Sequence, residues 1–290
     1  MTALATSRRL ILAALLALPL AAQADSPSRV VATGGSVAEI VYALGAGDRL
    51  IARDTTSSFP PEVTALPDVG YVRALSSENL IAMDPDLILT EHDAGPPEVI
   101  EMLRRTGIPL VSVPQALDPD GVIAKIDTVA TALGLPDEGA TLASQTMASL
   151  DKARQAGADL PQSPRVLFIL SMQGGRLMAG GADTSAAAMI TLAGGTNAMT
   201  AFTGYKPVTD EAVIAAAPDV ILMMDRGGDH EITLRDIQTH AALALTPAGA
   251  ESRVITMDGL YLLGFGPRTG EAAQALTAEL RRTLSGDQDG

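Results

Sequence analysis

In the segment DVGYVRALSSENL, residues 68–80, one side chain could supply an anionic oxygen and a second could supply the positive charge that stabilises it. Tyr71 and Arg73 lie two residues apart, and an extended backbone points such side chains to the same side. A free phenol loses its proton at about pH 10, so a phenolate at neutral pH needs a nearby cation. The Arg73 guanidinium could hydrogen-bond that oxygen, or it could bind a carboxylate of a ligand. In the alternative interpretation, Tyr71 is a half-buried turn residue and Arg73 is a solvated charge.

A very similar segment, GYKPVTDEAVIAAAPDVIL at residues 204–222, returns 133 to 134 positions later. In the alignment of the two segments, Tyr205 falls on Tyr71 and Glu211 falls on Glu78. In both copies an apolar stretch of helical period leads through a Pro-Asp pair into a continuous apolar run of strand length. The chain therefore contains a duplicated supersecondary unit.

The rest of each half has the pattern of an α/β lobe. Continuous apolar runs separated by helical segments are typical of buried parallel strands. Residues 29–45 predict a strand, a glycine pair at 34–35 and a helix. Residues 165–195 predict the same order, with the glycine pair at 174–175 in the equivalent place. We therefore predict that each half is a small doubly wound lobe.

Between the halves, residues 119 to 160 are rich in Ala, Leu, Asp and Lys at helical spacing, with a break at Gly134-Leu135-Pro136. This pattern predicts two helices, which are stiffer than a Gly/Ser linker. The predicted fold class is α/β, with two doubly wound lobes related by internal duplication, joined by a long rigid helix, and a ligand cleft between them. The predicted parts are a signal peptide at 1–24, an N-terminal lobe at 25–118, a helical connector at 119–161 and a C-terminal lobe at 162–290.

Composition and the N-terminus favour an exported chain. Arg8 and Arg9 precede an apolar run, and Ala22-Gln23-Ala24 is a small-x-small cleavage site, so we predict a cleaved signal peptide and no direct membrane insertion. The 20 basic and 34 acidic residues give a net charge of -14, which argues against nucleic acid and anionic membranes as partners. The chain has no cysteine, so thiolate metal sites are excluded, and its three scattered histidines do not form a zinc pattern.

The sequence does not carry the motifs of common exported α/β enzymes. It lacks Gly-x-Ser-x-Gly, a P-loop and His-Glu-x-x-His. The glycines of TGGSVAEIV, residues 33–41, do not have the spacing of a dinucleotide-binding turn. We therefore predict that the chain is not an enzyme, and an exported α/β enzyme is kept as the alternative from a different class.

The segments DVGYVRALSSENL and MDGLYLLGFGPRT, residues 257–269, resemble the solute-binding proteins of ABC importers for haem, siderophores and cobalamin. Within that family they are most similar to the periplasmic haem-binding proteins. The resemblance covers essentially the whole chain after residue 24. It implies a monomeric periplasmic protein that binds ferric haem and delivers it to an ABC permease, and through the permease to an ATPase. A ferric-siderophore or cobalamin-binding protein of the same family is the alternative.

The resemblance also implies roles for four residues. Tyr71 occupies the place of the tyrosine that ligates ferric haem, and such an oxygen is known as a haem ligand elsewhere. Arg73 would hydrogen-bond the phenolate or a propionate. Glu78 and Glu211 match the glutamate of each lobe that contacts arginines of the permease. Acidic residues also occur in first helical turns because of the helix dipole, so the two roles are compatible.

The second lobe departs from the resemblance. Some relatives supply a histidine ligand from a Ser-His-Gly-Gly stretch, where this chain reads SMQGG at residues 171–175. Met172 could ligate the iron, as thioethers do in cytochromes, or it could be an apolar wall of the pocket. Tyr205 could contact the porphyrin face or a second haem, or it could be a turn residue at the rim. Arg226 follows a predicted strand and could neutralise a propionate.

Overall fold

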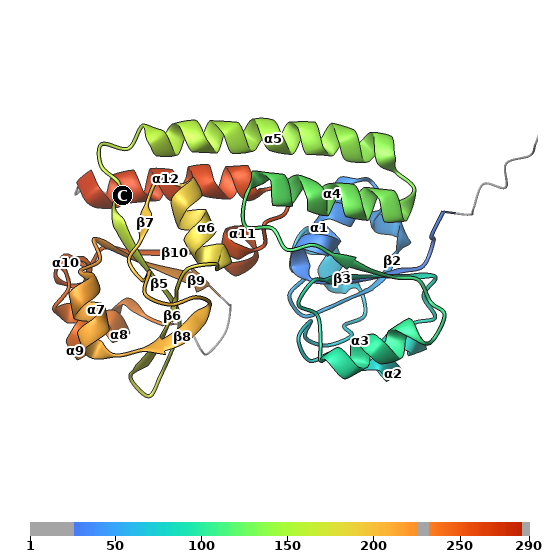
Figure 1. Cartoon of the computed structure of the whole chain (residues 1–290), viewed down its shortest axis with the longest axis horizontal. Helices are drawn as coiled ribbons and strands as arrows, with labels where there is room; N and C mark the ends of the chain where they lie inside the picture. Colours follow the sequence, from blue (N-terminus) through green and yellow to red (C-terminus); the bar gives the residue numbers. More distant parts are fainter. Residues whose placement is uncertain (1–25, 226–231, 286–290) are drawn as a thin grey trace, which may run out of the picture.

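The protein has two lobes beneath a layer of long helices, as Figure 1 shows. The computed structural model describes residues 26–225 and 232–285. The predicted signal peptide and Arg226 therefore lie outside the described residues. Across those two ranges, no helix combines the length and the apolar character that a membrane crossing needs.

The N-terminal lobe is built on a four-stranded parallel sheet. Its elements are β1 (Val30–Thr33), α1 (Gly35–Ala43), the 3-10 turn η1 (Gly47–Arg49), β2 (Leu50–Arg53), the 3-10 turn η2 (Pro61–Ala65), α2 (Ser77–Ala82), β3 (Leu87–Glu91), α3 (Pro97–Arg104) and β4 (Leu110–Val113). The strand order is β2-β1-β3-β4. Val30 and Leu89 face α1, whereas Val31 and Ile88 face α2 and α3, so both faces of the sheet are buried. The predicted doubly wound arrangement is confirmed in this lobe.

The C-terminal lobe has a larger, mixed sheet. Its elements are β5 (Arg165–Gln173), β6 (Arg176–Gly180), α6 (Ser185–Leu192), β7 (Thr196–Asn197), β8 (Tyr205–Val208), α7 (Asp210–Ala216), β9 (Val220–Asp225), α8 (Leu234–Thr239), α9 (Ala241–Ala244), α10 (Pro247–Ala250), β10 (Val254–Asp258), α11 (Gly259–Leu263) and α12 (Thr269–Ser285). The strand order is β10-β9-β5-β6-β8, and β7 pairs with β5. β10, β9 and β5 are parallel, whereas β6 and β8 extend the sheet in antiparallel fashion.

The glycine pair at 174–175 corrects one prediction. It does not open a helix as Gly34 and Gly35 do; it forms the tight turn between the antiparallel strands β5 and β6. Gly174 has φ 56° and Gly175 has φ 77°, and two consecutive positive φ angles are what a two-residue hairpin turn requires. The second lobe therefore carries a β-hairpin where the first lobe passes directly from strand to helix.

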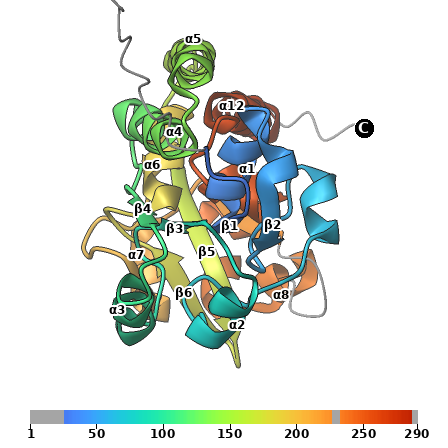
Figure 2. The same cartoon turned by 90° about the vertical axis from the view of Figure 1, so that its right-hand side faces the viewer.

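The connector consists of α4 (Pro119–Leu133) and α5 (Pro136–Ala158), and the predicted break falls at the left-handed Gly134, φ 70°. α12 packs along α5, and Figure 2 shows α5 outermost above α4 and α12. One buried apolar cluster runs from the N-terminal sheet through both connector helices into the C-terminal lobe, and it includes Val30, Ile126, Leu150, Val166 and Leu276. A shared core holds the lobes more firmly than a polar interface would. The exact lobe boundaries at 118 and 161 remain a prediction.

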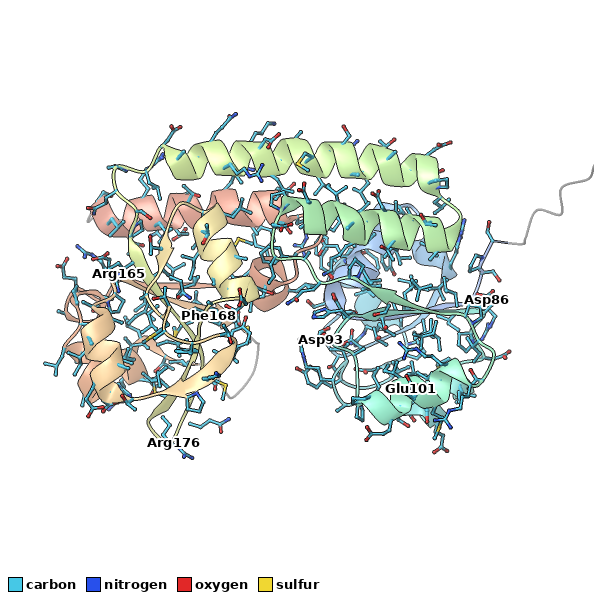
Figure 3. The ribbon with its side chains drawn as sticks, viewed as in Figure 1. Asp86, Asp93, Glu101, Arg165, Phe168 and Arg176 are labelled. Carbon is cyan, nitrogen blue, oxygen red and sulfur yellow. The ribbon has the colours of Figure 1, made fainter. Side chains whose placement is uncertain are left out.

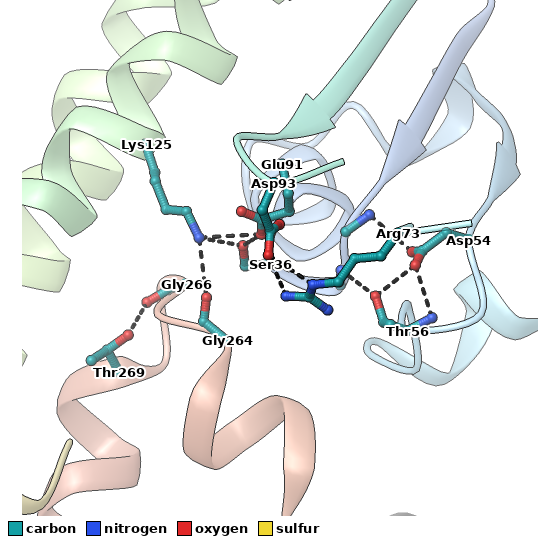
Figure 4. Close-up of polar contacts among 12 residues, drawn as sticks. Ser36, Asp54, Thr56, Arg73, Glu91, Asp93, Lys125, Gly264, Gly266 and Thr269 are labelled. Atoms are coloured by element: carbon teal, nitrogen blue, oxygen red, sulfur yellow. Dashed lines mark hydrogen bonds and ion pairs between the residues drawn. The ribbon is translucent and has the colours of Figure 1, made fainter. Parts of the chain in front are cut away.

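A buried charge ties the connector to both lobes (Figure 4). Lys125 of α4 is 3% exposed, and its Nζ lies 3.2 Å from Oε1 of Glu91 at the end of β3. The same Nζ donates to Oγ of Ser36, at 2.7 Å, and to the carbonyl oxygen of Gly264, at 3.1 Å. Ser36 belongs to the N-terminal lobe and Gly264 follows α11, so one ammonium group joins all three parts of the molecule.

A second tie lies beside it. Arg268 donates from Nε and Nη2 to the two carboxylate oxygens of Glu39, at 2.9 and 2.8 Å. Glu39 is a buried residue of α1, and the guanidinium stacks 3.5 Å from the ring centroid of Phe59. Bidentate arginine pairs combine energy with fixed geometry. Together the two ties set the angle between the lobes.

Replacing Glu91 with glutamine is expected to lower the free energy of unfolding by about 3–5 kcal/mol, because it leaves the Lys125 ammonium buried and unpaired. The double variant Glu91→Gln/Lys125→Met should recover most of that loss. Urea denaturation measures both. Glu101→Gln, at the exposed pair with Arg104, is the control and should change stability by no more than about 1 kcal/mol. A Glu91→Gln protein as stable as the wild type would contradict the role given to this tie.

Candidate functional site

Tyr71 and Arg73 lie in the turn between β2 and α2. Val72 and Leu75 are buried, whereas Arg73 is exposed and Tyr71 is 43% exposed, in a turn closed by a hydrogen bond from the Ala74 amide to the Tyr71 carbonyl. Arg73 Nη1 donates to the Tyr71 hydroxyl at 2.8 Å, and the guanidinium carbon lies 5.8 Å from the centre of the ring. The two side chains meet as predicted, but the backbone that carries them is a turn and not the extended segment that the prediction assumed. The arrangement offers a phenol oxygen with a positive charge directly beside it.

Asp93 completes this group, and the sequence analysis missed it. Arg73 Nε donates to Oδ2 of Asp93 at 2.8 Å, and Nη2 contacts the same oxygen. Burial lowers the pKa of Arg73, but the hydrogen bond to Tyr71 and the charge of Asp93 raise it more, so the net shift is upward. Figure 4 shows Asp93 just beyond the end of β3. That position was the available signal, because side chains that follow parallel strands gather at one sheet edge.

Tyr205 lies across from this group, on the other lobe. It begins β8 and packs edge-on against Phe168, with ring centroids 6.2 Å apart. Burial raises the pKa of the Tyr205 phenol, whereas hydrogen bonds at Ala186 and Thr184 and the positive charge of Arg73 act in the opposite direction. Arg73 of the N-terminal lobe therefore lies close enough to Tyr205 of the C-terminal lobe to act on it electrostatically. Figure 3 labels Phe168 in the C-terminal lobe and Asp93 in the N-terminal lobe.

Met172 does not lie on the face that carries Tyr205. A β-bulge between Ile169 and Ser171 shifts the register of β5, and such a bulge reverses the alternation of the side chains that follow it. Met172 therefore packs with Leu177 against the apolar cluster on the opposite face of the sheet. Met178 pairs with Pro207, two residues along the strands from the Gly180–Tyr205 pair, so it lies on the Tyr205 face.

Glu78 and Glu211 are exposed, one in the first turn of α2 and one in the first turn of α7. The N-caps of these helices, Ser76 and Thr209, accept hydrogen bonds from the backbone in equivalent ways. Hydrogen bonds from the backbone of Glu211 and from Thr209 lower the pKa of the Glu211 carboxyl. Both glutamates are therefore available to a partner while also serving their own helices.

A duplicated pair of α/β lobes with a helical connector, and with a tyrosine and an exposed acidic residue at equivalent positions of each lobe, is the architecture of a two-lobed substrate-binding protein. Residues 30–261 match the periplasmic binding protein family, and this chain belongs to that family.

Several similar proteins are named as heme-binding proteins or as vitamin B12-binding proteins. The structure of the periplasmic heme-binding protein BhuT in complex with two hemes is 40% identical, covers 88% of this chain and 98% of its own, and superposes with a TM-score of 0.84. The apo form of the heme-binding protein RhuT from Roseiflexus sp. RS-1 is 37% identical, with coverage of 88% and 98% and a TM-score of 0.85. A vitamin B12-binding protein of Pectobacterium carotovorum is 27% identical over 88% of both chains.

Proposed function

We propose that this chain is a periplasmic haem-binding protein that delivers ferric haem to an ABC importer. The observation that carries the proposal is the Tyr71 phenol, which is exposed and accepts a hydrogen bond from Arg73. A phenolate oxygen is an established haem ligand, and a neighbouring cation favours its ionised form. The likeness to structures described as heme-binding proteins supports the same ligand class.

Binding would combine apolar burial with oriented polar contacts. Burial of the porphyrin faces contributes about 25 cal/mol per Å² of apolar area, less the costs of association and desolvation. On the C-terminal lobe, the adaptable side chain of Met178 and the flat ring of Tyr205 would contact the porphyrin. Met172, which was predicted to make such a contact, lies on the opposite face of the sheet. Arg73 and Arg226 are proposed to meet the propionates. The protein acts as a carrier and performs no reaction on its ligand.

Delivery would use the duplicated acidic surface. Glu78 and Glu211 are proposed to contact the permease, one from each lobe. Each is followed one helical turn later by an exposed isoleucine, Ile81 at 40% and Ile214 at 41% exposure. An apolar side chain beside a charge, repeated in both lobes, is suited to a protein partner. We further propose export through the signal peptide at 1–24, lobes at 25–118 and 162–290 around the connector 119–161, and a monomer that meets the ATPase through the permease.

Cobalamin is the second candidate, because several curated relatives are named as vitamin B12-binding proteins. A thermal-shift comparison separates the candidates. Hemin at 100 times its dissociation constant should stabilise the protein by about 2.7 kcal/mol and raise the melting temperature by about 5 °C or more. At the same concentration, cyanocobalamin, a ferric siderophore and iron-free protoporphyrin should each raise the melting temperature by less. A larger shift with cobalamin than with hemin would assign the protein to the second candidate.

A further inference from the structure

We propose that Asp93 is a positioning residue, which holds the Arg73 guanidinium against the Tyr71 oxygen and so fixes the place of that oxygen before the ligand arrives. This inference rests on the proposed function, haem binding through Tyr71. It goes beyond the pairing of Tyr71 with Arg73, because it assigns the orientation of that pair to a third residue that lies 20 residues away from Arg73 in sequence.

The guanidinium of Arg73 donates hydrogen bonds to two different residues. Nε and Nη2 both donate to Oδ2 of Asp93, while Nη1 donates to the Tyr71 hydroxyl. An arginine side chain has many rotamers, and two bonds to a single oxygen select one of them. The remaining N–H groups of the fork are then free to meet a ligand carboxylate on the same side.

Asp93 is itself held by the backbone. The amide of Gly95 donates to the carbonyl of Val72 at 2.9 Å, and the amide of Leu75 donates to the carbonyl of Gly95 at 2.7 Å. These bonds join the segment after β3 directly to the turn that carries Tyr71 and Arg73. At the start of the segment, Glu91 is fixed by the buried Lys125. The carboxylate therefore has a rigid support that reaches from the connector helix to the site.

Neither stability nor ligand charge explains this carboxylate. The side chains of Arg73 and Asp93 are 54% and 34% exposed, and ion pairs at such sites contribute little to folding. A negative charge beside the site also opposes an anionic ligand and partly offsets Arg73. Orientation of the guanidinium is the effect that favours the ligand.

The test compares Asp93→Asn with Asp93→Ala. The asparagine amide oxygen can accept both N–H bonds, so this variant keeps the orientation and removes the charge. Alanine removes both. If Asp93 positions Arg73, Asp93→Ala should weaken hemin binding by about tenfold or more and shift the phenolate-to-iron absorption band, while Asp93→Asn stays near the wild type or binds tighter. Asp151→Asn, at the exposed pair with Arg154 on α5, is the matched control and should change neither.

Each outcome decides a separate point. If Asp93→Asn and Asp93→Ala both bind hemin more tightly than the wild type, by the same factor and with an unshifted absorption band, the carboxylate acts through its charge alone. That result would overturn the inference while the proposed function stands. Failure of the wild-type protein to bind hemin would overturn the proposed function, and the inference with it. Unchanged thermal melting of the variants without ligand shows that the comparison concerns the site and not the fold.

Discussion

Replacing both Glu78 and Glu211 with alanine is expected to abolish haem uptake while hemin binding stays unchanged. The two carboxylates are exposed at equivalent positions of the two lobes. Glu211 lies on the other lobe from Tyr71 and Arg73. Loss of one partner of an interfacial charge pair costs docking affinity about 30-fold or more, so loss of both should leave uptake below detection. Growth on hemin as the iron source, in cells that depend on this importer, measures the effect.

The control addresses the role of acidic residues within their own helices. Glu138 is an exposed glutamate in the first turn of α5, on the connector and away from both lobe helices. Glu138→Ala removes the same kind of charge from the same kind of helical position, so it should leave uptake intact. Normal growth of the Glu78→Ala/Glu211→Ala strain, with the protein present at the wild-type level, would remove the docking proposal.

Replacing Tyr71 with phenylalanine is expected to weaken hemin binding by more than about 100-fold. The substitution keeps the ring and removes the oxygen, so Arg73 loses its phenol partner and the iron loses its ligand. Even the loss of an outer-shell partner costs a metal site about 10- to 100-fold in affinity, and loss of the ligand itself should cost more. Titration of hemin followed by absorbance measures the affinity.

Tyr42 of α1 provides the matched control for that titration. It packs beside Gly47 within the N-terminal lobe, and burial raises the pKa of its phenol. Tyr42→Phe should bind hemin as the wild type does. Equal affinities of Tyr71→Phe and the wild type would show that the iron takes its ligand from another residue.

Local pattern predicted most of the fold. The helices over 35–43 and 185–192, the connector helices and the buried parallel strands all follow from hydrophobic periodicity and from glycine or proline at their ends. The glycine pair at 174–175 was misinterpreted, because a Gly-Gly pair fits both a helix start and a hairpin turn. The choice depends on β6, which pairs with β5 across the glycine pair and which the sequence analysis did not predict as a strand.

The site was predicted less completely than the fold. The pairing of Tyr71 with Arg73 was predicted from strand alternation, whereas the structure brings the two side chains together in a turn. The face of Met172 depends on a bulge at Ile169–Ser171, which reverses alternation and leaves no clear local signal. The contact of Asp93 with Arg73 depends on how two loops pair.

The ferric absorption spectrum of the purified protein, recorded as hemin is added, tests the central claim most directly. The account predicts a red, saturable complex with a high-spin spectrum and a phenolate-to-iron band that disappears in Tyr71→Phe. A protein that stays colourless with hemin, or a spectrum that is the same in the wild type and in Tyr71→Phe, would contradict it.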